Sequence, residues 1–88
     1  MKSIKSLFKN EATRKILLFF NENSNCIDTA KGISLWIGAD INVIQKALNQ
    51  LVKEGVITSH TAASTAAYAY TNNKDIVKKV EKCVKNMV

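Results

Sequence analysis

The sequence contains no proline, only three glycines, one histidine and two cysteines in 88 residues. Because no proline-containing linker, repeat or low-complexity segment divides it, we expect a single domain over residues 1–88. The longest uninterrupted apolar run, from Ile16 to Phe20, is far shorter than a membrane span. The single histidine is accompanied by no glycine-rich phosphate loop and no interpretable pair of carboxylates, so we expect no enzyme activity.

The two cysteines, Cys26 and Cys83, lack the spacing of a zinc site, and we expect no metal, cofactor or small-molecule ligand. Sequence alone neither supports nor excludes a disulfide between them. We favour two small, half-buried side chains in a reducing compartment, and the alternative is a redox-sensing pair. Lys5 and Lys9 interrupt any apolar segment near the N-terminus, so we expect no signal peptide, no membrane partner and a cytoplasmic location.

Charge is unevenly distributed along the chain. The formal net charge is +6, which favours an acidic partner such as nucleic acid. Lysine and arginine outnumber the acidic residues in segments 1–15 and 72–88, whereas the segment between them is close to neutral. We therefore expect the positive charge to lie mainly on the terminal helices.

Segment 41–53 has two opposed faces when it is given a helical period. One face is an apolar stripe at spacing i, i+3, i+4 and i+7, formed by Ile44, Ala47, Leu48 and Leu51. The opposite face is rich in amides and contains no acidic residue, and it is formed by Asn42, Gln45, Lys46, Asn49 and Lys53. Solvated helix faces usually mix Glu with Lys. Asn and Gln pair bidentately with adenine edges and Lys pairs with guanine, so this face favours DNA contact.

The same helix has clear start and stop signals. Asp40 is a typical N-cap residue just after Gly38, and Gly55 follows the last turn. The short apolar run Val56-Ile57 comes next and has the character of a strand. Helix, tight turn, helix and strand is the layout of a winged helix-turn-helix, so we expect a mainly α fold with a small β-hairpin.

From about Thr29 to Lys74 the chain resembles winged helix-turn-helix transcriptional regulators of the MarR-like or ArsR-like kind. The residues that carry the resemblance are Ile37, Gly38, Asp40, Ile44, Leu48, Leu51, Gly55 and Ile57, followed by Tyr68-Ala69-Tyr70-Thr71. It implies sequence-specific binding of double-stranded DNA by a small regulator, with helix 41–53 in the major groove. The implied contacts are Asn42, Val43, Gln45, Lys46, Asn49 and Lys53. The first four lie nearest the base edges, whereas Lys53 is placed to touch phosphate.

Periodicity and capping residues also place the remaining elements. We expect an N-terminal arm or helix over 1–9, a scaffold helix over 10–22, a helix-turn-helix over 29–38 and 41–54, a wing over 56–71 and a C-terminal helix over 73–87. Asp28 or Thr29 caps the first helix of the turn motif, and Asn72 or Asn73 caps the last helix. Cys26-Ile27 is expected in a brief first strand, and the wing tip is expected at 61–65.

The expected wing departs from the pattern that it resembles. Such wings usually carry Arg or Lys at the tip, but residues 59–67 contain no charged residue and no glycine. His60 is expected to be an exposed strand residue. The loss of cations removes part of the electrostatic contribution to DNA binding. This favours an alternative, a winged-helix module that binds protein with little or no DNA binding.

Several apolar residues appear surplus to the core of one small domain. They are Ile4, Leu7 and Phe8 in the arm, with Ile76, Val77, Val80, Cys83, Val84 and Met87 in the last helix. We expect them to form a homodimer interface from residues 1–20 and 73–88. Leu35 and Trp36 are also difficult to bury together. Either one of them packs under the terminal helices, or the pair joins a subunit interface.

Overall fold

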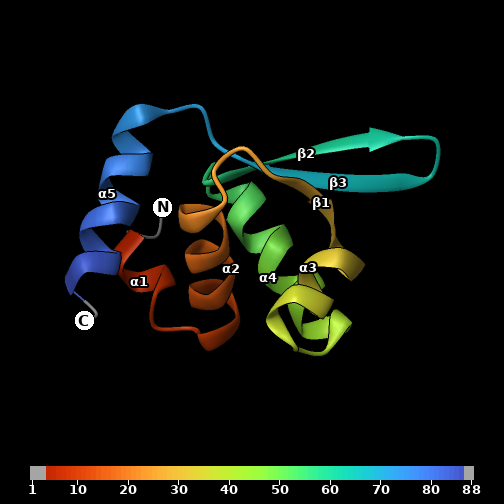
Figure 1. The fold of residues 1–88 in the computed structure, drawn as a ribbon, viewed down its shortest axis with the longest axis horizontal. Coiled ribbons are helices and arrows are strands. Elements are labelled where there is room, and N and C mark those ends of the chain that lie inside the picture. Colours follow the sequence, from red (N-terminus) through yellow and green to blue (C-terminus); the bar gives the residue numbers. More distant parts are fainter. Residues whose placement is uncertain (1–3, 87–88) are drawn as a thin grey trace.

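The computed structural model describes residues 4–86, without the side chain of Lys5, and has the winged helix-turn-helix fold that the sequence predicts (Figure 1). Its elements are α1 (Ile4–Leu7), α2 (Glu11–Glu22), β1 (Ile27–Thr29), α3 (Ala30–Ile37), α4 (Ile41–Lys53), β2 (Ile57–Ala62), β3 (Thr65–Tyr70) and α5 (Lys74–Asn86). The helix bounds lie close to the expected ones. Residues 1–3 of the expected arm and Met87 of the expected last helix lie outside the described residues.

The turn between α3 and α4 is fixed by three local features. Thr29 caps α3, since its Oγ1 accepts a hydrogen bond from the Gly32 N–H at 3.1 Å. Gly38 ends α3 in the left-handed region at φ 76°, a conformation that favours glycine. Asp40 then caps α4 by accepting a hydrogen bond from the Asn42 N–H at 2.8 Å. The chain therefore reverses within three residues, and this fixes which face of α4 points outward.

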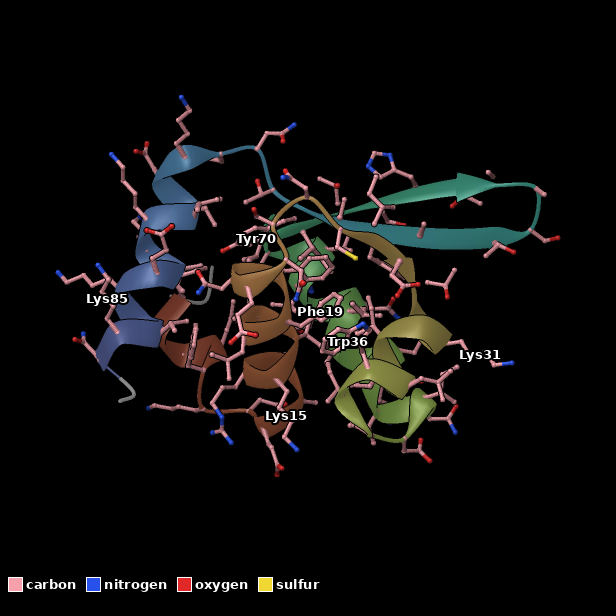
Figure 2. All side chains as sticks on the ribbon, in the orientation of Figure 1. Lys15, Phe19, Lys31, Trp36, Tyr70 and Lys85 are labelled. Atoms are coloured by element: carbon pink, nitrogen blue, oxygen red, sulfur yellow. The ribbon has the colours of Figure 1, made fainter. Side chains whose placement is uncertain are left out.

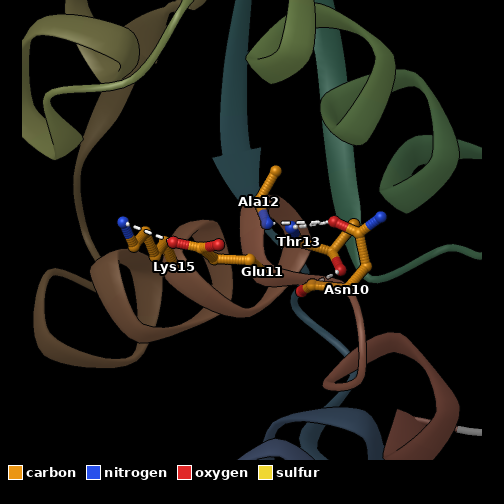
Figure 3. Close-up of polar contacts among 5 residues, drawn as sticks. All are labelled: Asn10, Glu11, Ala12, Thr13 and Lys15. Carbon is orange, nitrogen blue, oxygen red and sulfur yellow. Dashed lines mark hydrogen bonds and ion pairs between the residues drawn. The ribbon is translucent and has the colours of Figure 1, made fainter.

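Asparagine caps begin the two helices that support this motif. Asn10 Oδ1 accepts hydrogen bonds from the N–H groups of Ala12 at 2.9 Å and Thr13 at 3.2 Å, which starts α2 (Figure 3). Asn73 Oδ1 accepts from the Asp75 N–H at 3.0 Å and starts α5. Asn73 is thus the cap of the last helix, and Thr29 is the cap of α3.

The apolar stripe expected on α4 is confirmed, because it forms the centre of the core. Ile44, Leu48 and Leu51 are fully buried. They belong to one core cluster with Ile16, Leu17 and Phe20 of α2 and Ile33 of α3. Phe20 also stacks on Tyr70 of β3, with ring centroids 5.9 Å apart. The core therefore ties α4 to the scaffold helix on one side and to the sheet on the other.

We expected the apolar residues of the terminal helices to exceed what one chain can bury, and this was wrong. Leu7 and Phe8 are buried, and Val80 is fully buried, within this one chain. The other members that the structure describes, Ile4, Ile76, Val77, Cys83 and Val84, are partly buried against the same core. The reason lies in contacts between helices that are far apart in the sequence. The short α1 lies against α5, and α5 lies against α2, so the termini cover each other (Figure 1).

The sheet has the order β1-β3-β2, and all pairs are antiparallel. The wing tip is shorter than expected, since Thr61, Ala62 and Thr65 belong to the strands and only Ala63-Ser64 forms the turn. Ala63 makes this possible by adopting φ 56°, a conformation more usual for glycine or asparagine. The first strand also starts later than expected, at Ile27 instead of Cys26.

Replacing Leu48 with alanine should lower the free energy of unfolding by about 2–5 kcal/mol, because it leaves a cavity at the centre of the core. Urea denaturation with far-UV circular dichroism measures the change. Asn49→Ala is the matched control, since Asn49 is the exposed next residue of the same helix, and it should change stability by less than about 0.5 kcal/mol. Equal stability of the two variants would contradict the assignment of faces.

The Tyr70 hydroxyl is buried and has no hydrogen-bond partner among the described residues. Burial, with a smaller contribution from the Glu81 charge, raises the pKa of Tyr70 to about 12. Tyr70→Phe keeps the ring and removes the unpaired hydroxyl, so stability at neutral pH should be unchanged or higher by about 1 kcal/mol.

Alkaline titration tests the same group. The pKa of Tyr70 is higher in the folded chain than in the unfolded chain, where it is about 10. The contribution of the neutral Tyr70 hydroxyl to the free energy of unfolding is therefore complete below pH 10 and is lost as the pH rises toward about 12. Urea denaturation across this interval should show a smaller loss for Tyr70→Phe than for the parent. Tyr68→Phe is the control, because the Tyr68 hydroxyl accepts a hydrogen bond and its removal should destabilise at neutral pH. A parent and a Tyr70→Phe variant with identical alkaline profiles would contradict the assignment.

Candidate nucleic-acid interface

The outer face of α4 presents most of the side chains that the sequence singles out for DNA contact. Asn42, Lys46, Asn49 and Lys53 are exposed, and Val43 is 51% exposed near the start of the helix. They lie outward because the apolar stripe at helical spacing is held against α2 and α3. The helix thus offers a mainly polar surface, with two apolar side chains, Ile41 and Val43, exposed at its N-terminal end.

Gln45 differs from the other predicted contacts, because it is partly buried on the flank of α4 that faces the sheet. Its Nε2 donates hydrogen bonds to Asn49 Oδ1 at 3.0 Å and to the Tyr68 hydroxyl at 2.9 Å. Both donor hydrogens of this amide are therefore engaged. The Gln45 Oε1 acceptor and the Asn49 Nδ2 donors make no hydrogen bond to any described residue, so the pair still offers one acceptor and one donor group.

The contact between Tyr68 and Gln45 could not be predicted from the sequence. The two residues are separated by 23 positions, and no local pattern links a helix amide to a strand hydroxyl. Alternation along β3 indicates only that Tyr68 and Tyr70 share a face, and both are buried there. A Tyr-rich strand that closely follows an amide-rich helix is the single hint that the sequence offers.

The two cations of the face carry uncompensated charge. Neither Lys46 nor Lys53 forms an ion pair with any described residue, whereas Lys15 is paired with Glu11 at 3.1 Å (Figure 3). A cation without a carboxylate partner keeps its full attraction for phosphate. Electrostatically, α4 is therefore better prepared for an anionic partner than the wing, where β2 and β3 contain no charged residue.

A cavity of about 310 Å³ adjoins this face, between α4 and the corner of α1 and α2. Val43, Lys46 and Gln50 of α4 line one side of it, and Asn10 and Thr13 line the other. The cavity lies beside the exposed residues of α4, and the Lys46 side chain forms part of its wall.

Three large apolar side chains outside α4 are exposed in the described part of the chain. Leu35 is 73% exposed and Trp36 is 67% exposed, and Ile27 of β1 is 65% exposed. The Trp36 ring meets Phe19 of α2 edge-on, with centroids 5.5 Å apart, and does not pack under the terminal helices (Figure 2). Of the two interpretations of Leu35 and Trp36, packing under the terminal helices is not observed, and both side chains are exposed, as a subunit interface would require.

Other candidate features lie apart from α4. His60 is exposed on β2, as expected, and its Nε2 lies 3.1 Å from Thr58 Oγ1. Cys26 and Cys83 are free thiols, each partly buried. Among residues 4–86, no group of three or more His, Cys, Asp or Glu side chains is placed to hold a metal ion. In the same residues, every helix is too short or too polar to cross a membrane.

Comparisons with solved structures agree on the fold. No protein-family model and no curated protein matches the sequence. A structure from Methanosarcina mazei Go1, described as a possible transcriptional regulator, superposes with a TM-score of 0.75 at 13% identity, covering 96% of this chain and 75% of that one. Reduced HlyU from Vibrio cholerae N16961 gives a TM-score of 0.69 at 16% identity, covering 88% and 77%. Disulfide-formed AbfR gives 0.63 at 13% identity, covering 90% and 61%. At these identities the likeness shows a shared winged-helix fold.

Proposed function

We propose that this chain is a small transcriptional regulator that binds double-stranded DNA sequence-specifically, with α4 in the major groove. One observation carries the proposal. The exposed side of α4 combines amides with the unpaired cations Lys46 and Lys53 and contains no acidic side chain, while the opposite side is wholly buried. The fold shared with a protein described as a possible regulator supports the same interpretation.

The roles of individual side chains follow from their position along α4. Asn42 and Lys46 belong to the first two turns, where a helix in the major groove approaches base edges, and Val43 is exposed there to meet a thymine methyl. Lys53, at the other end, is placed to bind phosphate. Gln45 and Asn49 act as a hydrogen-bonded pair, which presents an acceptor and a donor from two adjacent turns.

Binding to random duplex DNA tests the proposal most directly. Affinity should fall steeply between about 50 and 200 mM salt, because cations of the protein displace counterions from phosphate. Lys53→Gln should reduce the slope of log affinity against log salt by about 0.9, the share of one phosphate contact. Lys82→Gln removes an exposed lysine of α5 instead, and it should leave the slope unchanged. No measurable binding at low salt would overturn the proposal.

Gln45→Ala should relax the base preference at one position of a site selected from random duplexes, and it should cost about 1–3 kcal/mol on the preferred sequence. Because Gln45 is also held by Tyr68, Tyr68→Phe is the informative companion. It keeps the amide but frees one of its donors, and should therefore change which base is preferred without removing the preference. If Gln45→Ala and Asn42→Ala bind every sequence as the parent does, α4 is not the reading helix.

A cytoplasmic homodimer completes the proposal. Two α4 helices about one turn of DNA apart would read a palindrome, and both strands of the site would then contribute to specificity. The terminal helices are weak candidates for the interface, because their apolar side chains are largely used within the chain.

The alternative function is a winged-helix module that binds protein instead of DNA. It is favoured by the uncharged wing and by the exposed side chains of Leu35 and Trp36. The salt titration separates the two, since a protein-binding module would show no salt-dependent affinity for random duplex DNA.

A further inference from the structure

The wing is the longest uncharged part of the chain. Residues 56–73 contain no charged residue, no glycine and no proline, although charged residues make up 23% of the sequence. Within this segment β2 is an edge strand, because the order β1-β3-β2 gives it β3 as its single neighbour. Every residue of β2 after Ile57 is exposed.

Edge strands of natural proteins are usually protected against pairing with another chain. The common devices are an edge lysine, a proline, a β-bulge, a very short strand or a covering element, and β2 has none of them. It is six residues long, and its register with β3 advances one residue at a time from Ile57↔Tyr70 to Ala62↔Thr65. The hairpin also extends beyond the helices, so its outer part is not covered (Figure 1).

The antiparallel register with β3 determines which main-chain N–H and C=O groups of β2 are free to form hydrogen bonds with another strand. Ala62 and Thr65 flank the two-residue turn and form a hydrogen-bonded pair. Because such pairs alternate along an antiparallel ladder, the N–H and C=O groups of Ile57, Ser59 and Thr61 point away from β3. These three residues have the spacing that an added antiparallel strand requires.

We propose that a second copy of this chain pairs with β2 in antiparallel orientation, with Ser59 opposite Ser59 of the other copy. Ile57 of each copy then lies opposite Thr61 of the other, so all three outward-pointing residues on each side find partners. The product is a continuous sheet of six strands across a twofold axis. Because the surface is the same on both copies, the assembly closes at two chains.

The distribution of charge favours a second copy of this chain as the partner that pairs with β2. Two chains that each carry +6 repel one another, and the wing is the surface on which their approach costs least. An acidic or basic partner would gain no attraction from an edge without charge. At the opposite edge of the sheet, β1 has only three residues and competes poorly for an added strand. This inference concerns assembly and holds independently of DNA binding.

Analytical ultracentrifugation of the full chain over a range of micromolar concentrations tests the pairing. The parent should sediment at twice the 9.7 kDa of one chain. Ser59→Lys places two like charges directly opposite each other, and should raise the dimer dissociation constant at least tenfold. Ser64→Lys adds the same charge in the turn, outside the pairing, and should dimerise as the parent does. Circular dichroism establishes that both variants are folded.

Three results would overturn the proposal. They are a parent that remains a monomer throughout, a Ser59→Lys variant that dimerises normally, and equal weakening by Ser59→Lys and Ser64→Lys, which would point to net charge as the cause. A folded, monomeric Ser59→Lys variant can still be titrated against duplex DNA. Failure of the pairing and failure of DNA binding are thus read from separate experiments.

Discussion

The packing of α4 against α2 is the contact on which the rest of the structure depends. Ile44, Leu48 and Leu51 have no exposed surface, so α4 cannot rotate about its axis without exposing core side chains to water. The tight turn at Gly38 and the cap at Asp40 fix where the helix begins. Together they determine that amides and lysines face outward along α4, with Ile41 and Val43 exposed at its N-terminal end.

Features encoded locally could be predicted from the sequence, and features that depend on distant contacts could not. The helical period of α4 and its caps lie within a few residues of one another, so the pattern identified both faces. Burial of Leu7 and Phe8 depends on α5, about 70 residues away in sequence. The local pattern therefore wrongly indicated that these side chains could not be buried within one domain. The wing tip was expected at 61–65, but its two-residue length could not be predicted, because alanine rarely takes a positive φ and Ala63 therefore gives no signal of so tight a turn.

In the candidate site, too, the features encoded locally could be predicted, and the feature that depends on a distant contact could not. Helical spacing placed Asn42, Lys46, Asn49 and Lys53 on one exposed face. It placed Gln45 there too, but could not show that Tyr68 engages its amide. This contact matters chemically, because a bidentate pair with adenine uses one donor and one acceptor of the same amide. Both donors of Gln45 are occupied, so reading adenine alone would require it to give up a hydrogen bond that it already makes.

Tyr68 therefore links α4 to the wing. On β3 it lies directly opposite Ser59 of β2, the residue at the centre of the proposed pairing between copies. Its hydroxyl accepts a hydrogen bond from Gln45 Nε2 at 2.9 Å. A strand added to β2 would restrict the twist of the hairpin, and Tyr68 would carry that restriction to the Gln45 side chain. Ordering a side chain before it binds lowers the conformational entropy that binding must overcome. If α4 binds DNA as proposed, an uncharged wing that contributes little to phosphate contact would in this way still influence which bases α4 prefers.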